Sequence, residues 1–108
     1  IGPAILYRNN YSGNNSLAIQ LNDQIGNAFG IGSKVYIYYG DDKHQMQEIL
    51  AGGGSQSFNE AIVWFGLGKY TSVSRIKIVW STGEETLLEK DLESGAKYTI
   101  SRLDFDTL

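Results

Sequence analysis

The glycine triplet in GGGS, at residues 52–55, is the first feature of this sequence that could bind a ligand. Phosphate-binding loops use backbone N–H groups that converge at the start of a helix, with Lys and Ser or Thr at fixed positions. Here no Gly-Lys-Ser or Gly-Lys-Thr follows the triplet, and the next segment has no helical periodicity. The GIG at residues 30–32 likewise lacks the third glycine of a dinucleotide fingerprint. The triplet therefore indicates a chain reversal that needs positive φ angles.

Histidine and carboxylate chemistry has few candidates, because His44 is the single histidine and the chain has no cysteine. A hydrolytic triad needs a nucleophile and a buried acid around the histidine, and the nucleophile pattern G-x-S-x-G is absent. Asp41 and Asp42 do not have the ligand spacing of a calcium loop. Glu48 and Glu60 flank the glycine-rich loop and could supply the two carboxylates of a glycoside hydrolase. We therefore expect no catalytic residue, metal or cofactor, and keep a hydrolase that uses Glu48 and Glu60 as a third hypothesis.

Two tyrosines offer binding chemistry of another kind. In one alternating segment, Tyr36 and Tyr38 share a face, while Val35, Ile37 and Tyr39 share the opposite face. One face of an antiparallel sheet commonly meets water, and exposed aromatic rings offer flat apolar area with polar edges. The tyrosine pair therefore predicts a surface for a protein or a sugar; the alternative is packing under a loop or against a neighbouring domain.

The polar tip of the glycine-rich loop extends this candidate surface. It joins two predicted strands and carries hydroxyl, amide and aromatic side chains, which suit a protein or glycan contact. The candidate binding residues are Tyr36, Tyr38, Ser55, Gln56, Phe58 and Asn59.

Short alternating runs predict the elements that must position these residues. Leu17, Ile19 and Leu21 have the period of two that is typical of a half-buried strand. Turn signals separate similar runs about every ten residues, and no segment shows sustained helical periodicity. The predicted strands cover residues 5–7, 15–22, 34–40, 43–51, 62–66, 73–81, 85–89 and 97–102. Seven to eight short strands predict an all-β fold, an antiparallel β-sandwich or a jelly-roll-like domain.

The densest apolar run, at residues 62–65, is predicted to be a strand buried on both faces. Trp64 and Phe65 are therefore placed in the core, together with Trp80 of a later strand. Phe65 and Leu67 are expected to anchor the end of this strand, while Gly66 and Gly68 allow the exit turn. Within the loop at 23–33, Phe29 and Ile31 are expected to plug an open end of the core.

Composition limits the classes of partner. The chain has 108 residues and a net charge of −3, with nine basic and twelve acidic residues, so it lacks the basic face that nucleic acid requires. No apolar run approaches the ~18 residues of a membrane span, so we expect no span in this fragment. Thirteen aromatic residues can supply the core of one ordered domain. A start at Ile1 suggests a piece of a longer protein.

Six short motifs resemble, in order, the C-terminal domain of the ASPIC/UnbV family and the end of the FG-GAP/VCBS-type repeat that precedes it. They are LYRNN at 6–10, N-x-L-x-I-x-L at 15–21, GIGSKV at 30–35, GGG at 52–54, FGLG at 65–68 and VWSTG at 79–83. Ser81 stands where the family often has proline, and Ser55 and Gln56 stand where an aromatic usually follows the glycines. If that aromatic contacts a ligand in relatives, this chain lacks the contact. The residues of the structural motif are Gly52, Gly53, Gly54, Phe65, Gly66, Leu67, Gly68 and Trp80.

This resemblance implies a domain layout and a setting. Residues 1–14 would be a linker or the remnant of a preceding propeller repeat, 15–103 the ASPIC/UnbV-like β domain, and 104–108 a tail. The partners would be the preceding propeller domain of the same chain and a protein or glycan ligand. The setting would be an exported, periplasmic, cell-surface or secreted protein.

The first functional hypothesis is a non-catalytic interaction module at the C-terminus of an exported propeller-containing protein, which mediates protein or surface binding. The second is a carbohydrate-binding module in the handling of envelope glycans. Both use the tyrosine pair and the polar loop tip, so they differ in the ligand rather than in the site.

Overall fold

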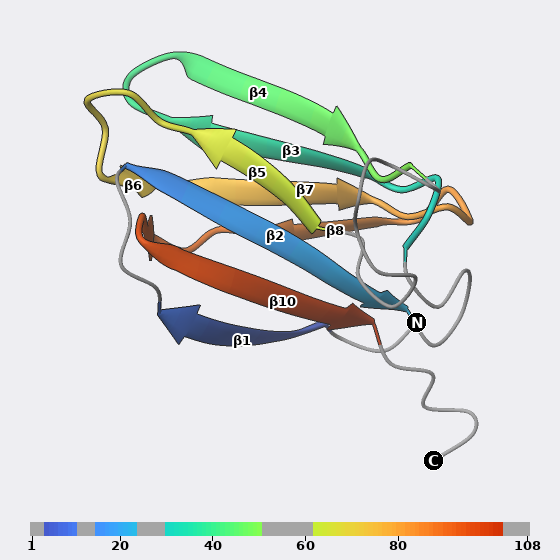
Figure 1. Cartoon of the computed structure of the whole chain (residues 1–108). Helices are drawn as coiled ribbons and strands as arrows, with labels where there is room; N and C mark the ends of the chain where they lie inside the picture. Colours follow the sequence, from blue (N-terminus) through green and yellow to red (C-terminus); the bar gives the residue numbers. More distant parts are fainter. Residues whose placement is uncertain (1–3, 11–14, 24–29, 51–61, 103–108) are drawn as a thin grey trace.

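The chain is a β-sandwich in a computed structural model that describes residues 4–10, 15–23, 30–50 and 62–102. Within these residues the structure consists of ten strands and no helix (Figure 1). The strands are β1 (Ala4–Asn10), β2 (Ser16–Asp23), β3 (Lys34–Tyr39), β4 (Lys43–Glu48), β5 (Ile62–Gly66), β6 (Ser72–Val73), β7 (Arg75–Val79), β8 (Glu85–Leu88), β9 (Leu92–Glu93) and β10 (Ala96–Arg102). The predicted all-β sandwich is confirmed.

The first sheet has the strand order β1-β10-β2-β5. Strands β10 and β2 run parallel, and the other two pairs are antiparallel. Because β10 is the last strand of the described residues and lies between β1 and β2, the sheet joins segments that are far apart in sequence. Residues 4–10, which the sequence assigned to a linker or repeat remnant, pair with β10 along their whole length.

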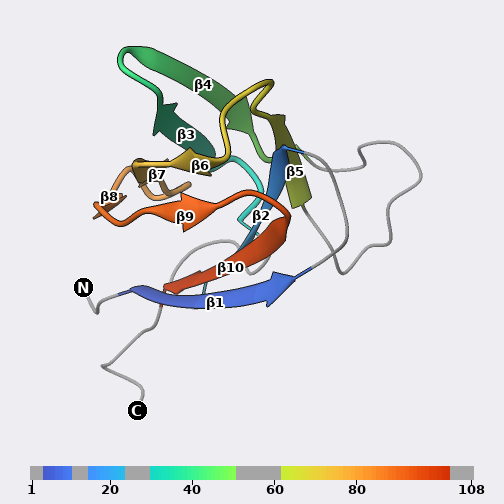
Figure 2. The same ribbon diagram turned by 90° about the vertical axis from the view of Figure 1, so that its left-hand side faces the viewer.

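The second sheet has the order β4-β3-β7-β8 and is antiparallel throughout. A third, two-stranded sheet of β6 and β9 lies between the two larger sheets in Figure 2. Two sequence predictions change here. The single strand expected at 73–81 is divided into β6 and β7 at Ser74, and the short strand β9 is not among the predicted strands.

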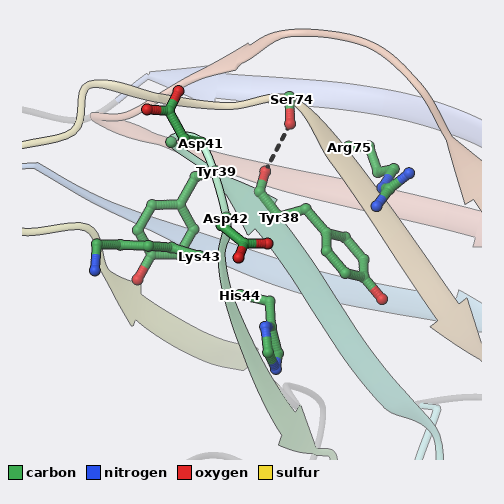
Figure 3. A pocket seen from close by; sticks show the side chains of 9 residues that line it. Tyr38, Tyr39, Asp41, Asp42, Lys43, His44, Ser74 and Arg75 are labelled. Carbon is green, nitrogen blue, oxygen red and sulfur yellow. Dashed lines mark hydrogen bonds between the residues drawn. The ribbon is translucent and has the colours of Figure 1, made fainter.

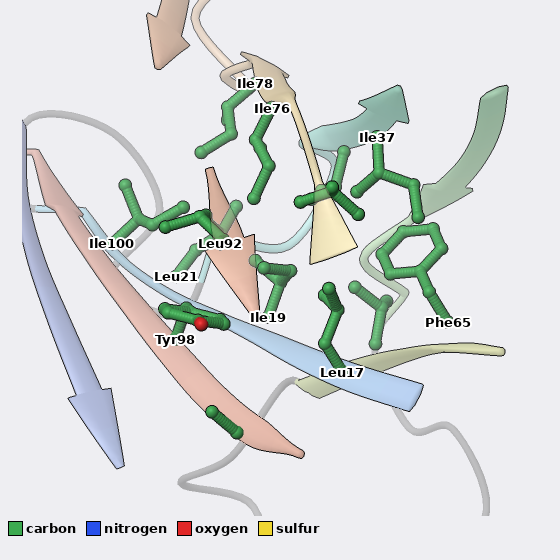
Figure 4. Packing of buried hydrophobic residues seen from close by; sticks show 14 of the residues in the cluster. Leu17, Ile19, Leu21, Ile37, Phe65, Ile76, Ile78, Leu92, Tyr98 and Ile100 are labelled. Carbon is green, nitrogen blue, oxygen red and sulfur yellow. The ribbon is translucent and has the colours of Figure 1, made fainter. Parts of the chain in front are cut away.

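The core lies between the facing sheets, where apolar side chains from alternate positions meet (Figure 4). Alternation places one side chain of each pair inward, since successive Cβ atoms of a strand point to opposite faces. Burying each Leu, Ile or Phe side chain stabilises the fold by roughly 1.5–3 kcal/mol. The fully enclosed side chains include Leu17, Ile19, Val35, Ile37, Phe65, Ile76, Ile78, Trp80, Tyr98 and Ile100. Ile31 packs partly buried against this cluster, and Phe29 lies outside the described residues.

Strand β5 corrects one prediction. Its burial alternates, and Trp64 is 51% exposed, so the strand is not buried on both faces and Trp64 is not a core residue. The physical reason is its place at the edge of a two-layer sandwich, where only one face of each sheet meets the core. Phe65 and Trp80 are buried as predicted.

Candidate functional site

The outer face of the second sheet carries the tyrosines that the sequence nominated. In β3 the burial pattern alternates, so Val35, Ile37 and Tyr39 point into the core while Tyr36 and Tyr38 remain half-buried on the outside. Neighbouring strands place further side chains on the same face. We call this surface the tyrosine face; it comprises His44 and Met46 of β4, Tyr36 and Tyr38 of β3, Arg75 and Lys77 of β7, and Leu87 of β8.

The first row across this face is His44, Tyr38 and Arg75, which are cross-strand partners. The guanidinium carbon of Arg75 lies 4.3 Å from the centroid of the Tyr38 ring. The His44 ring lies on the other neighbouring strand, with its centroid 6.2 Å from that of Tyr38 and a tilt of 32°. A cation over an aromatic ring at such an exposed site stabilises the pair by about 0.5–1 kcal/mol.

The second row repeats the arrangement with Met46, Tyr36 and Lys77. The Lys77 Nζ lies 4.7 Å from the centroid of the Tyr36 ring. Exposed apolar side chains stand at both ends of this row. Met46, at the β4 end, is 46% exposed, and Leu87, the partner of Lys77 on β8, is 50% exposed. The row therefore joins apolar area to a positive charge.

Neither cation of the tyrosine face has an acidic partner within the described part of the chain. The ion pairs found there involve Arg8 and Arg102, and none includes Arg75 or Lys77. Their charges rest against tyrosine rings instead. The N–H groups of Arg75 and Lys77 are therefore available to acceptors outside the domain.

A cleft of about 220 Å³ opens at the end of this face, around the turn between β3 and β4 (Figure 3). Two hydrogen bonds fix Ser74 to Tyr38 in the wall of the cleft: the backbone N–H and the hydroxyl of Ser74 both donate to the Tyr38 carbonyl, at 2.8 and 3.0 Å. Gly40 has a φ of 63°, and a Cβ there would lie 2.8 Å from the Tyr70 ring, so the turn requires glycine. The cleft is lined by Tyr38, Tyr39, Gly40, Asp41, Asp42, Lys43, His44, Ser74 and Arg75.

The loop half of the predicted site lies outside the described residues. This applies to Ser55, Gln56, Phe58 and Asn59, and also to Gly52, Gly53, Gly54 and Glu60. Of the hypothetical carboxylate pair, Glu48 is exposed at the end of β4, opposite Lys34. The described structure therefore brings Tyr36 and Tyr38 together with cations that the sequence analysis did not single out.

The end of β5 has the predicted anchor and turn, with one change. Leu67 is 2% exposed, and its backbone N–H donates to the Asn15 carbonyl at 2.7 Å. Gly68 has a φ of 62°, which favours glycine, and its carbonyl accepts a bond from Asn15 Nδ2 at 2.9 Å. Gly66 has no positive φ, and a Cβ there would meet nothing within 4 Å. The exit turn therefore depends on Gly68 and not on Gly66.

Two glutamines of β4 have a role that the sequence analysis missed. Gln45 and Gln47 point toward β5, where Gln45 Nε2 donates to the Gly66 carbonyl at 2.7 Å and Gln47 Nε2 donates to the Trp64 carbonyl. Exposed strand edges invite pairing with other chains, so side chains that cover their carbonyls protect them. The signal was the weak alternation of β4, where glutamines occupy the inward positions.

Arg102 and Asp23 form a buried ion pair, which extends to Thr82 and Glu84 nearer the surface and which the sequence also did not reveal. The Arg102 guanidinium donates to both carboxylate oxygens of Asp23, at 2.9 and 2.7 Å, and both residues are at most 2% exposed. It also donates to Thr82 Oγ1 at 2.9 Å and Glu84 Oε1 at 3.0 Å. The same group lies 4.6 Å from the Trp80 ring centroid. The cluster links the first sheet to the turn between β7 and β8.

The polar groups of this cluster have partners within the fold. Among the described residues, no buried side-chain nitrogen or oxygen lacks a hydrogen-bond partner. The Arg102 N–H groups that bind both carboxylate oxygens of Asp23 are not available to bind another molecule. Across residues 4–10, 15–23, 30–50 and 62–102, no group of three or more His, Cys, Asp or Glu side chains is arranged to hold a metal ion.

The described residues contain no helix that is long and apolar enough to cross a membrane.

These features define the class of protein as a small β-sandwich domain with a buried Arg–Asp pair and an aromatic, cationic outer face. Comparison with known proteins narrows this class, because residues 23–104 match the family described as ASPIC and UnbV. The match spans most of the chain, so the chain belongs to this family. Neither the curated proteins nor the solved structures contain a match.

Proposed function

We propose that this domain is a non-catalytic interaction module that binds a protein partner through the tyrosine face. The observation that carries the proposal is the pair of half-buried tyrosines, Tyr36 and Tyr38, each held against a cation that no acid of the described structure neutralises. Tyrosine, arginine and methionine are enriched in protein interfaces, and tyrosine and arginine are among the residues that dominate their binding energy. The tyrosine face contains all three residue types.

The composition of the opposite outer face supports this choice. The first sheet presents Tyr7, Ile5 and Trp64 as exposed large side chains, but β10 and β2 separate β1 from β5. On the tyrosine face, by contrast, the side chains are cross-strand partners on neighbouring strands, so they form one continuous surface. Contiguous surfaces of aromatic, apolar and cationic groups provide the central anchor that a stable interface needs.

The wider setting of the proposal rests on the resemblance of the sequence motifs. We place the module at the C-terminus of an exported protein, after a propeller of FG-GAP/VCBS type. The polar loop tip, Ser55 to Asn59, remains a candidate second part of the docking surface.

A carbohydrate ligand is the alternative, and the ring geometry favours a protein. Sugars stack on the open faces of aromatic rings, where the flat apolar area is available. Here Lys77 covers one face of the Tyr36 ring and Arg75 covers one face of the Tyr38 ring. A sugar that stacks on these ring faces would have to displace the cations, whereas a protein side chain can contact the cation and the ring edge together.

Photo-crosslinking tests the proposed surface. A benzophenone side chain is placed at position 36 in one variant and at position 7 in the control, and both are irradiated in cells that produce the protein. Tyr7 is a matched control, because it is a 65% exposed tyrosine on the outer face of the other sheet. We expect protein adducts from position 36 and none from position 7, identified by mass spectrometry.

Tyr36→Ala combined with Tyr38→Ala should then abolish the adduct from a benzophenone placed at position 46. Circular dichroism and the dispersion of amide NMR signals report whether the variant is folded. Equal adducts from positions 36 and 7 would contradict the proposed surface, and glycan adducts in place of protein adducts would favour the carbohydrate alternative.

A further inference from the structure

We propose that the partner presents an extended acidic segment to the tyrosine face, with carboxylates that bind Arg75 and Lys77. This inference rests on the proposed docking role of the face and names the chemistry of its partner. It commits to a protein segment that carries Asp or Glu, rather than to a sulfated glycan or a second copy of this chain.

Within the described residues, Arg75 and Lys77 form no ion pair. The chain has twelve acidic and nine basic residues, so acidic partners are not scarce. The cross-strand neighbours of Arg75 and Lys77 on β3 are nevertheless Tyr38 and Tyr36, and Leu87 lies beside Lys77 on β8. Opposite charges at cross-strand positions would stabilise the sheet, so this arrangement leaves positive charge on the surface. Since no acid of the described residues pairs with these two cations, we assign the complementary negative charge to the partner.

The ring contacts orient these cations. A free lysine or arginine side chain loses rotamer entropy when it binds, which opposes binding. Arg75 and Lys77 are already held 4.3 and 4.7 Å from ring centroids. Part of the ordering is therefore complete before a carboxylate arrives, which favours binding.

The spacing of the two cations selects an extended partner. Arg75 and Lys77 are alternate residues of one strand and share its outer face, so their Cα atoms are about 6.5–7 Å apart. Carboxylates at alternate positions of an extended segment have the same repeat. One segment in this conformation can therefore pair with both cations at once.

Acidic side chains mark the limits of the surface. Asp41 and Asp42 are exposed on the turn at one end, next to the His44 row. Glu48 and Glu85 lie at the other end, in the row that also contains Lys34. These carboxylates repel a longer acidic chain and confine it to the two tyrosine rows.

A peptide titration tests the inference directly. The probe is a short synthetic peptide of alternating glutamate and threonine, and its neutral counterpart carries glutamine in place of glutamate. Binding to the whole chain is followed by two-dimensional amide NMR at low salt. We expect the glutamate peptide to shift signals of β3 and β7, and the glutamine peptide to shift none.

Charge reversal locates the contact. Arg75→Glu combined with Lys77→Glu should lower the affinity for the glutamate peptide at least about tenfold, because each attraction becomes a repulsion. The matched control, Lys90→Glu combined with Lys97→Glu, changes the net charge equally away from this face and should weaken binding about twofold at most. Amide signal dispersion confirms that each variant is folded.

Three results would overturn the inference: no binding of the glutamate peptide, equal losses in the two charge-reversed variants, or binding of heparin without binding of the peptide. The last result would indicate a sulfated glycan. The outcome is separable from that of the proposed function. Adducts from position 36 that persist in the Arg75→Glu, Lys77→Glu variant would retain the docking surface and reject only the acidic partner.

Discussion

Arg75 and Arg102 have the same guanidinium-over-ring geometry in two different surroundings. Arg75 lies 4.3 Å from the Tyr38 ring on an exposed face, and Arg102 lies 4.6 Å from the Trp80 ring in the interior. Arg102 is neutralised by Asp23 and Glu84, whereas the described residues provide no acid for Arg75. The stacking contact alone therefore does not identify a binding site. A buried cation with acidic neighbours stabilises the fold, whereas an exposed cation without them can bind a partner.

Removing each arginine should give the largest contrast. Arg102→Met leaves the Asp23 carboxylate buried without its bidentate partner, and breaking a buried pair in this way costs about 3–5 kcal/mol of unfolding free energy. Arg75→Met removes a surface cation and should change stability by about 0.5 kcal/mol or less. Urea denaturation followed by circular dichroism measures both. A loss below about 1 kcal/mol for Arg102→Met would show that the buried cluster is not a structural tie.

Replacing the ring under each cation should give the next contrast. Trp80→Phe removes core volume and the bond from Trp80 Nε1 to Thr86 Oγ1 at 2.7 Å, so we expect a loss of about 1–3 kcal/mol. Tyr38→Phe keeps the ring and removes only a hydroxyl at the surface, with an expected change of about 0.5 kcal/mol or less. Thermal unfolding compares the two variants, and equal losses would mean that the outer face is also part of the stabilising core.

Ionic strength should affect binding at Arg75 strongly and the stability contributed by Arg102 only slightly. Raising ionic strength from about 0.05 M to about 0.5 M shortens the Debye length several-fold and should weaken the glutamate peptide about tenfold. The stability difference between the wild type and Arg102→Met should change by about 0.5 kcal/mol or less, since buried pairs are screened much less. Peptide titrations and urea denaturation at both ionic strengths test this. Peptide affinity that is independent of salt would rule out charge as its cause.

The alternating pattern predicted the inward faces of β2 and β3, because period two alone determines which side chains point to the core. It failed for Trp64, since an apolar run does not reveal whether its strand has one covered face or two. It also could not pair Arg102 with Asp23, which are 79 residues apart and meet because β10 runs parallel beside β2. Likewise, the tyrosines were visible in the sequence, but their cations depended on the β3–β7 register.

The smallest expected effect concerns the acids nearest to Arg75. Asp41 and Asp42 line the same cleft as Arg75 without forming an ion pair with it in the described structure. Asp41→Asn combined with Asp42→Asn should therefore raise the affinity for the glutamate peptide about two- to threefold at low salt, because a repulsion is removed.

The matched control for this change is Asp91→Asn combined with Glu93→Gln, which alters the net charge equally near the β9 end of the molecule. It should leave the affinity almost unchanged, as measured by the same NMR titration. Unchanged or weaker peptide binding after the Asp41 and Asp42 changes would contradict the expected repulsion, since the glutamate–threonine peptide has no cationic side chain for these carboxylates to attract. The carboxylates would then not limit the charge of this face, and the contrast between Arg75 and Arg102 would rest on burial alone.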